Sequence, residues 1–206
     1  MDFYKMQSPP PWDIHLSLDE MHPLVKSARA FAIEAHGTQT YSWKWKPQPY
    51  VRHLDHTVSL VQHSYPDEIN AQIVGYLHDV IEDTSRTYDD ILREFGSVIA
   101  DNVLLCSDKV GLDRDDSKAL TNAAFARADD LIYEPALRAK AADRLANWGL
   151  SLEDGKTKKC ARYLAEYPSF REAIARPLNS KLIDELEVVN DQAHRNLQDI
   201  KHRFST

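Results

Sequence analysis

Apolar residues recur every three or four positions along most of this chain, and that spacing predicts α-helices. The first predicted helix begins near Pro23, because proline suits the first position of a helix. Further helices are predicted over about residues 50–63, 66–81, 87–96, 97–106, 119–130, 135–148 and 180–202. Glycine is scarce, with 6 residues, and no run alternates apolar and polar residues between turns. The pattern therefore predicts an all-α fold.

Two stretches break the helical pattern and are expected to be loops. Residues 37–49 contain a glycine, two prolines and two tryptophans, and residues 107–118 are polar with four aspartates. Thr87, with Asp90 three residues later, forms a weak capping box that predicts a helix start. Residues 1–22 are expected to form an extended N-terminal arm. Residues 23–206 are then one domain, whose C-terminal amphipathic helix packs on the bundle or forms a homo-oligomer interface.

The composition is that of a globular protein, and it narrows the choice of partners. With 206 residues, 43% hydrophobic and 28% charged, the chain can form one domain with a buried core. The net charge of −7 disfavours general nucleic-acid binding, which usually requires a basic excess. No segment approaches the ~18 apolar residues that cross a bilayer, and the N-terminal sequence lacks a signal-like apolar stretch. A cytoplasmic protein is expected, with Cys106 and Cys160 as packing residues and no disulfide framework.

The segment GYLHDVIEDT, residues 75–84, carries the strongest chemical signal. His78 and Asp79 are adjacent and can reach one metal ion from one point on a helix, while Glu82 and Asp83 follow each of them by four residues. These four groups lie within an apolar run, where a charge cluster is costly unless a cation or partner compensates it. The alternative interpretation of this segment alone is a chance acidic patch at the end of a helix.

Two other segments complete a potential metal site. His53 lies at the start of a predicted helix in PYVRHL, residues 49–54. Asp143 lies within an Ala/Leu helix in KAADRLAN, residues 140–147. With His78 and Asp79 these residues form a set of two imidazoles and two carboxylates, which suits Mn²⁺, Fe²⁺ or Zn²⁺ better than a structural zinc. Four protein ligands on an octahedral ion leave positions open for water and a phosphate oxygen.

The order His…His-Asp…Asp resembles that of the HD superfamily. Residues 35–39 (AHGTQ), 49–53, 77–84, 87–96 and 140–147 resemble, in order and spacing, the successive blocks of the RelA/SpoT hydrolase domain. The resemblance extends over roughly residues 24–175 and is greatest to small single-domain alarmone hydrolases such as the metazoan SpoT homologue. It implies an HD-domain helical bundle with a central metal site.

The resemblance also implies a reaction and a role for each matching residue. The reaction is Mn²⁺-dependent removal of the 3′-pyrophosphate of guanosine alarmones, (p)ppGpp, giving GDP or GTP. The implied metal ligands are His53, His78, Asp79 and Asp143, and Glu82 and Asp83 would position and deprotonate the attacking water. The implied substrate contacts are Lys44, Lys46, Lys109, Lys140, Arg144 and Asn147.

Departures from the family pattern keep other substrates open. Leu54 replaces the usual proline after His53, and Tyr41 occupies the position of a base-contacting arginine. Lys44 and Lys46 could restore the charge, and the tryptophans at 43 and 45 could stack on a purine or cap the core. Alternative substrates are therefore (p)ppApp or NADPH, and the enzyme could act as an antitoxin to an alarmone synthetase. A non-catalytic nucleotide-binding module is the other alternative, although all six metal and acid positions are filled.

Overall fold

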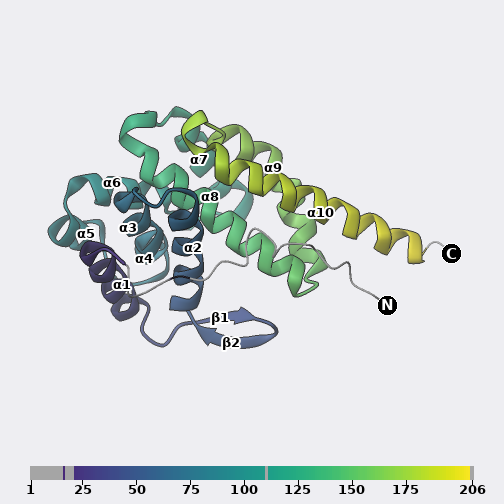
Figure 1. Ribbon diagram of the computed structural model, residues 1–206, viewed down its shortest axis with the longest axis horizontal. Coiled ribbons are helices and arrows are strands. Elements are labelled where there is room, and N and C mark those ends of the chain that lie inside the picture. Colours follow the sequence, from purple (N-terminus) through teal and green to yellow (C-terminus); the bar gives the residue numbers. More distant parts are fainter. Residues whose placement is uncertain (1–15, 17–20, 110, 205–206) are drawn as a thin grey trace.

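A computed structural model describes residue 16, residues 21–109 and residues 111–204 of the chain. The arm expected over residues 1–22 lies almost wholly outside these residues. The described part is a bundle of helices with one short hairpin (Figure 1). The elements are α1 (Pro23–His36), β1 (Thr40–Trp43), β2 (Lys46–Pro49), α2 (Val51–Ser64), α3 (Ile69–Leu77), α4 (Val80–Asp83), α5 (Tyr88–Phe95), α6 (Ser97–Cys106), α7 (Arg114–Arg127), α8 (Asp130–Glu153), α9 (Thr157–Ile174), a short 3₁₀ turn (Pro177–Asn179) and α10 (Ser180–Phe204).

Helix α8 lies at the centre of the bundle and packs against α2, α3, α6, α9 and α10. Its buried positions include many alanines, which let the surrounding helices approach closely: Ala136, Ala139, Ala141, Ala142 and Ala146. The α2–α3 pair is close for a similar reason, since a Cβ added at Gly75 would lie 3.0 Å from Cγ2 of Val58. This close packing fixes the middle of α8 relative to α2 and α3.

Pro135 interrupts the hydrogen bonding of α8, and the side chain of Asn102 repairs it. Proline has no N–H and its ring displaces the preceding turn of a helix. Here the N–H of Ala136 donates to Oδ1 of Asn102 at 2.9 Å, and Nδ2 of Asn102 donates to the carbonyl of Ile132 at 3.0 Å. Asn102 is fully buried on α6, so a side chain from one helix completes the backbone of another.

Several helix boundaries agree with the sequence predictions. Helix α1 begins at Pro23, and Nδ1 of His22 accepts a hydrogen bond from the N–H of Leu24. The capping box is present at α5, where Thr87 and Asp90 bond reciprocally. The C-terminal amphipathic helix is α10, and its apolar residues pack on the bundle, although its last turns extend beyond the other helices (Figure 1).

The prediction of a loop over residues 37–49 is wrong, because residues 40–49 form an antiparallel hairpin. Thr40 pairs with Pro49, and Trp43 pairs with Lys46. The turn residues Lys44 and Trp45 have φ values of 49° and 60°, and two successive positive φ values are typical of a type I′ turn. Type I′ turns favour Asn-Gly or Asp-Gly, so the Lys44-Trp45 sequence does not predict one. Contacts with the corner between α8 and α9 support the hairpin instead, including a hydrogen bond of 3.0 Å from the N–H of Lys44 to Asp154.

Three further boundaries differ from the predictions. The polar segment 107–118 is partly helical, because Asp113 caps the N-terminus of α7 and the helix begins at Arg114. The helix predicted over residues 66–81 is divided into α3 and α4, and His78 and Asp79 lie between the two. Helix α9 was not predicted, since Pro168 and a largely polar sequence obscure its apolar positions.

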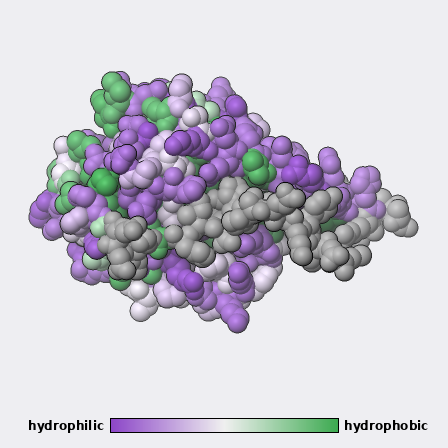
Figure 2. All heavy atoms as spheres, in the orientation of Figure 1, coloured by the Kyte–Doolittle hydropathy of each residue, from purple (hydrophilic) through white to green (hydrophobic). Residues whose placement is uncertain are grey.

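The surface is mainly hydrophilic on the face shown in Figure 2, with hydrophobic side chains in small separate groups. Leu131, at the start of α8, is the most exposed of the large apolar side chains that the structure describes, with 90% of its surface accessible. Both cysteines are buried and unpaired, as predicted. Among the described residues, no helix has the length and apolar character needed to cross a membrane.

Candidate metal centre and active site

Four side chains from three separate segments converge at the centre of the bundle. His53 comes from the first turn of α2, His78 and Asp79 from the junction of α3 and α4, and Asp143 from the middle of α8. Nε2 of His53 lies 3.2 Å from Oδ1 of Asp143 and 3.7 Å from Oδ2 of Asp79. Nε2 of His78 lies 2.9 Å from Oδ2 of Asp79 and 3.6 Å from Oδ1 of Asp143. The structure thus brings together all four residues that the sequence suggested as ligands.

The donor atoms fit a divalent cation. Ligand atoms of His53, His78 and Asp143 all lie within 4.8 Å of one another. Nδ1 of His78 is 2.8 Å from the carbonyl of Gly75, and this contact requires the proton on Nδ1. Nε2 of His78 is then a lone-pair donor, is fully buried, and has no hydrogen-bond partner among the described residues. A nitrogen lone pair facing carboxylate oxygens is unfavourable unless a cation lies between them, so this arrangement suits a metal ion.

The charges of the cluster are strongly coupled. Burial raises the pKa values of Asp79 and Asp143, but the two imidazoles outweigh this and hold both values well below the usual range. Burial lowers the pKa of His78, yet the neighbouring carboxylates raise it to about 10. A proton can therefore occupy the position of a metal ion at neutral pH, and metal binding would have to displace it.

Glu82 and Asp83 lie on α4, directly after the cluster. Oε2 of Glu82 accepts a hydrogen bond of 2.9 Å from the N–H of Asp108, which fixes one carboxylate oxygen. The pKa of Glu82 is raised by burial, and the pKa of Asp83 is raised by burial and by the charge of Asp79. Raised pKa values make both carboxylates better proton acceptors, as a general base requires.

Two of the suggested substrate residues lie beside the cluster. Nδ2 of Asn147 donates to Oδ1 of Asp143 at 2.6 Å. Nζ of Lys140 donates to the carbonyl of Cys106 at 3.0 Å and lies 4.0 Å from Oδ2 of Asp143. Only 7% of Lys140 is exposed, so its ammonium group compensates the carboxylates from inside the protein.

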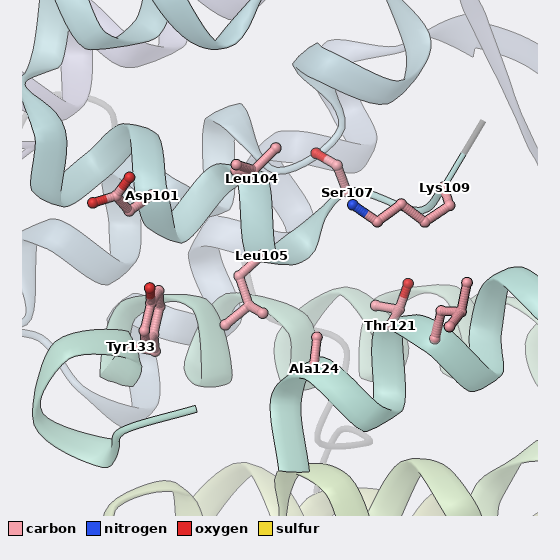
Figure 3. A pocket seen from close by; sticks show the side chains of 9 residues that line it. Asp101, Leu104, Leu105, Ser107, Lys109, Thr121, Ala124 and Tyr133 are labelled. Atoms are coloured by element: carbon pink, nitrogen blue, oxygen red, sulfur yellow. The ribbon is translucent and has the colours of Figure 1, made fainter. Parts of the chain in front are cut away.

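The other suggested substrate residues lie outside the cluster. The guanidinium of Arg144 pairs with Glu166 on α9 at 2.7 Å and lies over the rings of Tyr163 and Phe170. Lys44 and Lys46 are exposed on the hairpin. Lys109 lines a hollow of about 220 Å³ between α6 and α7, beside Ser107 at one end (Figure 3). The structure therefore does not place these four side chains beside the His/Asp cluster.

A supporting group of residues was not predicted. The hydroxyl of Tyr50 lies 2.5 Å from Oδ2 of Asp79, and its ring stacks on the imidazole of His36 at 4.4 Å. Nδ1 of His36 in turn contacts Oε1 of Gln39 at 2.7 Å. The blocks AHGTQ and PYVRH contain these residues, so the signal was present in the sequence, although no role was assigned to them there.

The chain has the all-α helical bundle predicted for an HD domain, with a His/Asp cluster at its centre. A similar solved structure is that of a metazoan orthologue of SpoT, described as hydrolysing ppGpp and playing a role in starvation responses. The TM-score is 0.69 with 22% sequence identity, over 85% of this chain and 96% of that chain. This similarity confirms the predicted fold and the resemblance inferred from the motifs. No protein-family model and no curated protein sequence matches the chain.

Proposed function

We propose that this protein is a metal-dependent pyrophosphohydrolase that removes the 3′-pyrophosphate of guanosine alarmones. The observation that carries this proposal is the convergence of four side chains, His53, His78, Asp79 and Asp143, around the buried Nε2 of His78. A pair of carboxylates, Glu82 and Asp83, directly follows them. The similarity to a structure described as a ppGpp hydrolase supports this substrate class.

The proposed ligands would hold one Mn²⁺ ion, which would supply a Lewis acid for the phosphoryl oxygen and a water of lowered pKa. Glu82 and Asp83 would orient that water and accept its proton, since burial raises the pKa values of both carboxyl groups. The water oxygen would form a bond to the phosphorus that is attached to the ribose 3′ oxygen. The bond between that phosphorus and the 3′ oxygen would then break. The 3′ oxygen takes up a proton, so ppGpp and water give GDP and pyrophosphate.

Nearby residues would stabilise the charge that develops on the phosphate. Lys140 supplies a fixed positive charge behind Asp143, and its position in the interior favours electrostatic action without direct contact with the substrate. Asn147 is half-buried on the same helix, beside Asp143, and would contact the sugar or a phosphate. Lys44, Lys46 and Lys109 would attract the remaining phosphates and the base.

The composition of the hairpin favours a second candidate, hydrolysis of another purine nucleotide such as (p)ppApp or NADPH. Tyr41 stacks on His53 at 5.1 Å, and 70% of Trp45 is exposed at the turn. Aromatic faces of this kind accept any purine, whereas an arginine at position 41 would favour the acceptor edge of guanine. Hydrolysis of a synthetase's toxic product would also make the protein an antitoxin.

The test is turnover by protein stripped of metal, incubated with ppGpp, ppApp or NADPH, with and without Mn²⁺. Ion chromatography separates released pyrophosphate from phosphate. Pyrophosphate release from ppGpp that requires Mn²⁺, and that is lost in Asp79→Ala, is the expected result. Phosphate release from NADPH alone, or pyrophosphate release from ppApp alone, would instead support the second candidate. No turnover of any of these nucleotides would contradict both.

A further inference from the structure

The hydroxyl of Tyr50 lies between two carboxylates that have different proposed roles. Its oxygen is 2.5 Å from Oδ2 of Asp79, a proposed metal ligand, and 3.3 Å from Oδ2 of Asp83, a proposed proton acceptor. A phenol has one proton to donate, so the shorter contact to Asp79 is the stronger hydrogen bond. The hydroxyl therefore links the ligand shell of the metal site to the group that would handle the water.

Tyr50 is held in place by two ring contacts and one backbone hydrogen bond. It stacks on the imidazole of His36 with an interplanar angle of 23°, and it meets the ring of His53 edge to face at 5.5 Å. The N–H of Tyr50 donates to the carbonyl of Gln39 at 3.1 Å. A side chain with so little freedom can fix the position of the groups that its hydroxyl contacts.

The same support also reaches Asp83 through the main chain. The side chain of Gln39 contacts Nδ1 of His36 with its oxygen at 2.7 Å and donates from Nε2 to the carbonyl of Asp83 at 2.6 Å. Gln39, His36, Tyr50 and Asp83 therefore form a closed ring of contacts. This ring connects the end of α1 and the start of the hairpin to the last residue of α4.

We infer that Tyr50 is a positioning residue that holds Asp79 in its ligand orientation and keeps Asp83 at a fixed separation from it. This inference rests on the proposed function, because it assigns Asp79 and Asp83 the roles given there. Hydrogen bonds to ligating carboxylates orient the ligand, and loss of such an outer partner typically costs about 10–100-fold in metal affinity or activity.

The test is Tyr50→Phe, which removes one oxygen and retains the ring that stacks on His36. Binding of Mn²⁺ alone is measured by electron paramagnetic resonance of the free ion, without any nucleotide. We expect the Kd for Mn²⁺ to rise by about 10–100-fold. With the nucleotide that the wild-type protein hydrolyses, we expect kcat at saturating Mn²⁺ to fall by at least about tenfold. We expect KM to stay within about twofold, because the hydroxyl is engaged by Asp79 and Asp83.

Tyr88→Phe is the matched control, since the hydroxyl of Tyr88 also donates to a carboxylate, that of Asp101 at 2.7 Å, away from the site. This variant should bind Mn²⁺ like the wild-type protein. A second variant, Gln39→Ala, removes the amide that holds the main chain of Asp83 and leaves the phenol in place. It should reduce kcat with little change in the Kd for Mn²⁺.

Three outcomes would overturn the inference. They are an unchanged Kd in Tyr50→Phe, an equal weakening in Tyr88→Phe, and a loss of Mn²⁺ binding in Gln39→Ala as large as that in Tyr50→Phe. The metal measurement needs no substrate, so it decides the role of Tyr50 even if none of the tested nucleotides is hydrolysed. Failure of the proposed function and failure of this inference are therefore separate results.

Discussion

Replacement of Asn102 by alanine is expected to destabilise the protein well beyond the effect of an ordinary polar substitution. The Asn102 side chain makes three hydrogen bonds, to the carbonyls of Val98 and Ile132 and from the N–H of Ala136. Alanine removes all three and leaves the Ala136 N–H buried. The N–H of Ala136 cannot find a partner within α8 instead, because the ring of Pro135 keeps the adjacent turns of the helix apart.

The size of the effect follows from these contacts. A buried donor left without a partner costs about 1–3 kcal/mol. The cavity left by the amide adds to this, so the free energy of unfolding should fall by about 2–4 kcal/mol. For a chain of this length, each kcal/mol shifts Tm by about 2–4 °C, so Tm should fall by roughly 5–15 °C.

Urea denaturation followed by circular dichroism measures the change in the free energy of unfolding, and calorimetry measures Tm. Asn122→Ala on α7 is the matched control, since its half-buried side chain makes a solvent-exposed hydrogen bond of 3.3 Å to Ser169. That variant should lose less than about 0.5 kcal/mol. If Asn102→Ala unfolds at the same urea concentration as Asn122→Ala, α8 does not depend on the side chain that bridges Pro135.

Other predictions concern the metal, the pH dependence and the α8–α9 contact. Mn²⁺ at 100 times its Kd should stabilise the wild-type protein by about 2.7 kcal/mol in thermal melts. The Tm of Asp143→Asn should not change, and equal shifts of Tm in the two proteins would place the ion elsewhere. Burial, with the charge of Asp184, raises the pKa of Glu185 to about 7, so the folded state binds the proton more tightly than the unfolded state does. The free energy of unfolding should therefore fall as pH rises through 7. In urea melts at pH 8, Glu185→Gln should be more stable than the wild type by about 1 kcal/mol, after allowance for the partial exposure of this side chain. At pH 4 the variant should show no such gain. Arg144→Met should lower Tm through loss of the Glu166 pair while KM stays within about twofold; a large rise in KM would instead support a substrate contact.

The parts of the fold that depend on local chemistry could be predicted from the sequence. Pro23 begins α1 because its missing N–H costs nothing there, and Thr87 with Asp90 caps α5 by bonding to backbone groups at its N-terminus. The convergence of the His/Asp cluster was also predictable, whereas its occupation by a metal ion stays a prediction. His53, His78 and Asp143 lie in apolar surroundings, where such groups persist only if something pairs with them.

The parts that depend on distant contacts could not be predicted in this way. The Lys44–Trp45 turn adopts positive φ values against its local preference, because the hairpin is bonded to Asp154 more than a hundred residues later. The orientation of Arg144 has the same origin. In the sequence it is adjacent to Asp143, which suggests a place in the site, but in the structure its guanidinium pairs with Glu166 on α9.

The position of α8 has a consequence for how the protein is made. The proposed ligands on α2 and at the α3–α4 junction leave the ribosome long before α8 is complete, because synthesis proceeds from the N-terminus. Until α8 is present, the earlier helices lack the element around which they pack, and their histidines and carboxylate have no fourth partner. Under the proposed function, capture of a metal ion would therefore follow the synthesis of α8. A chain interrupted before Asp143 would lack one of the four proposed ligands together with the helix that holds the others in place.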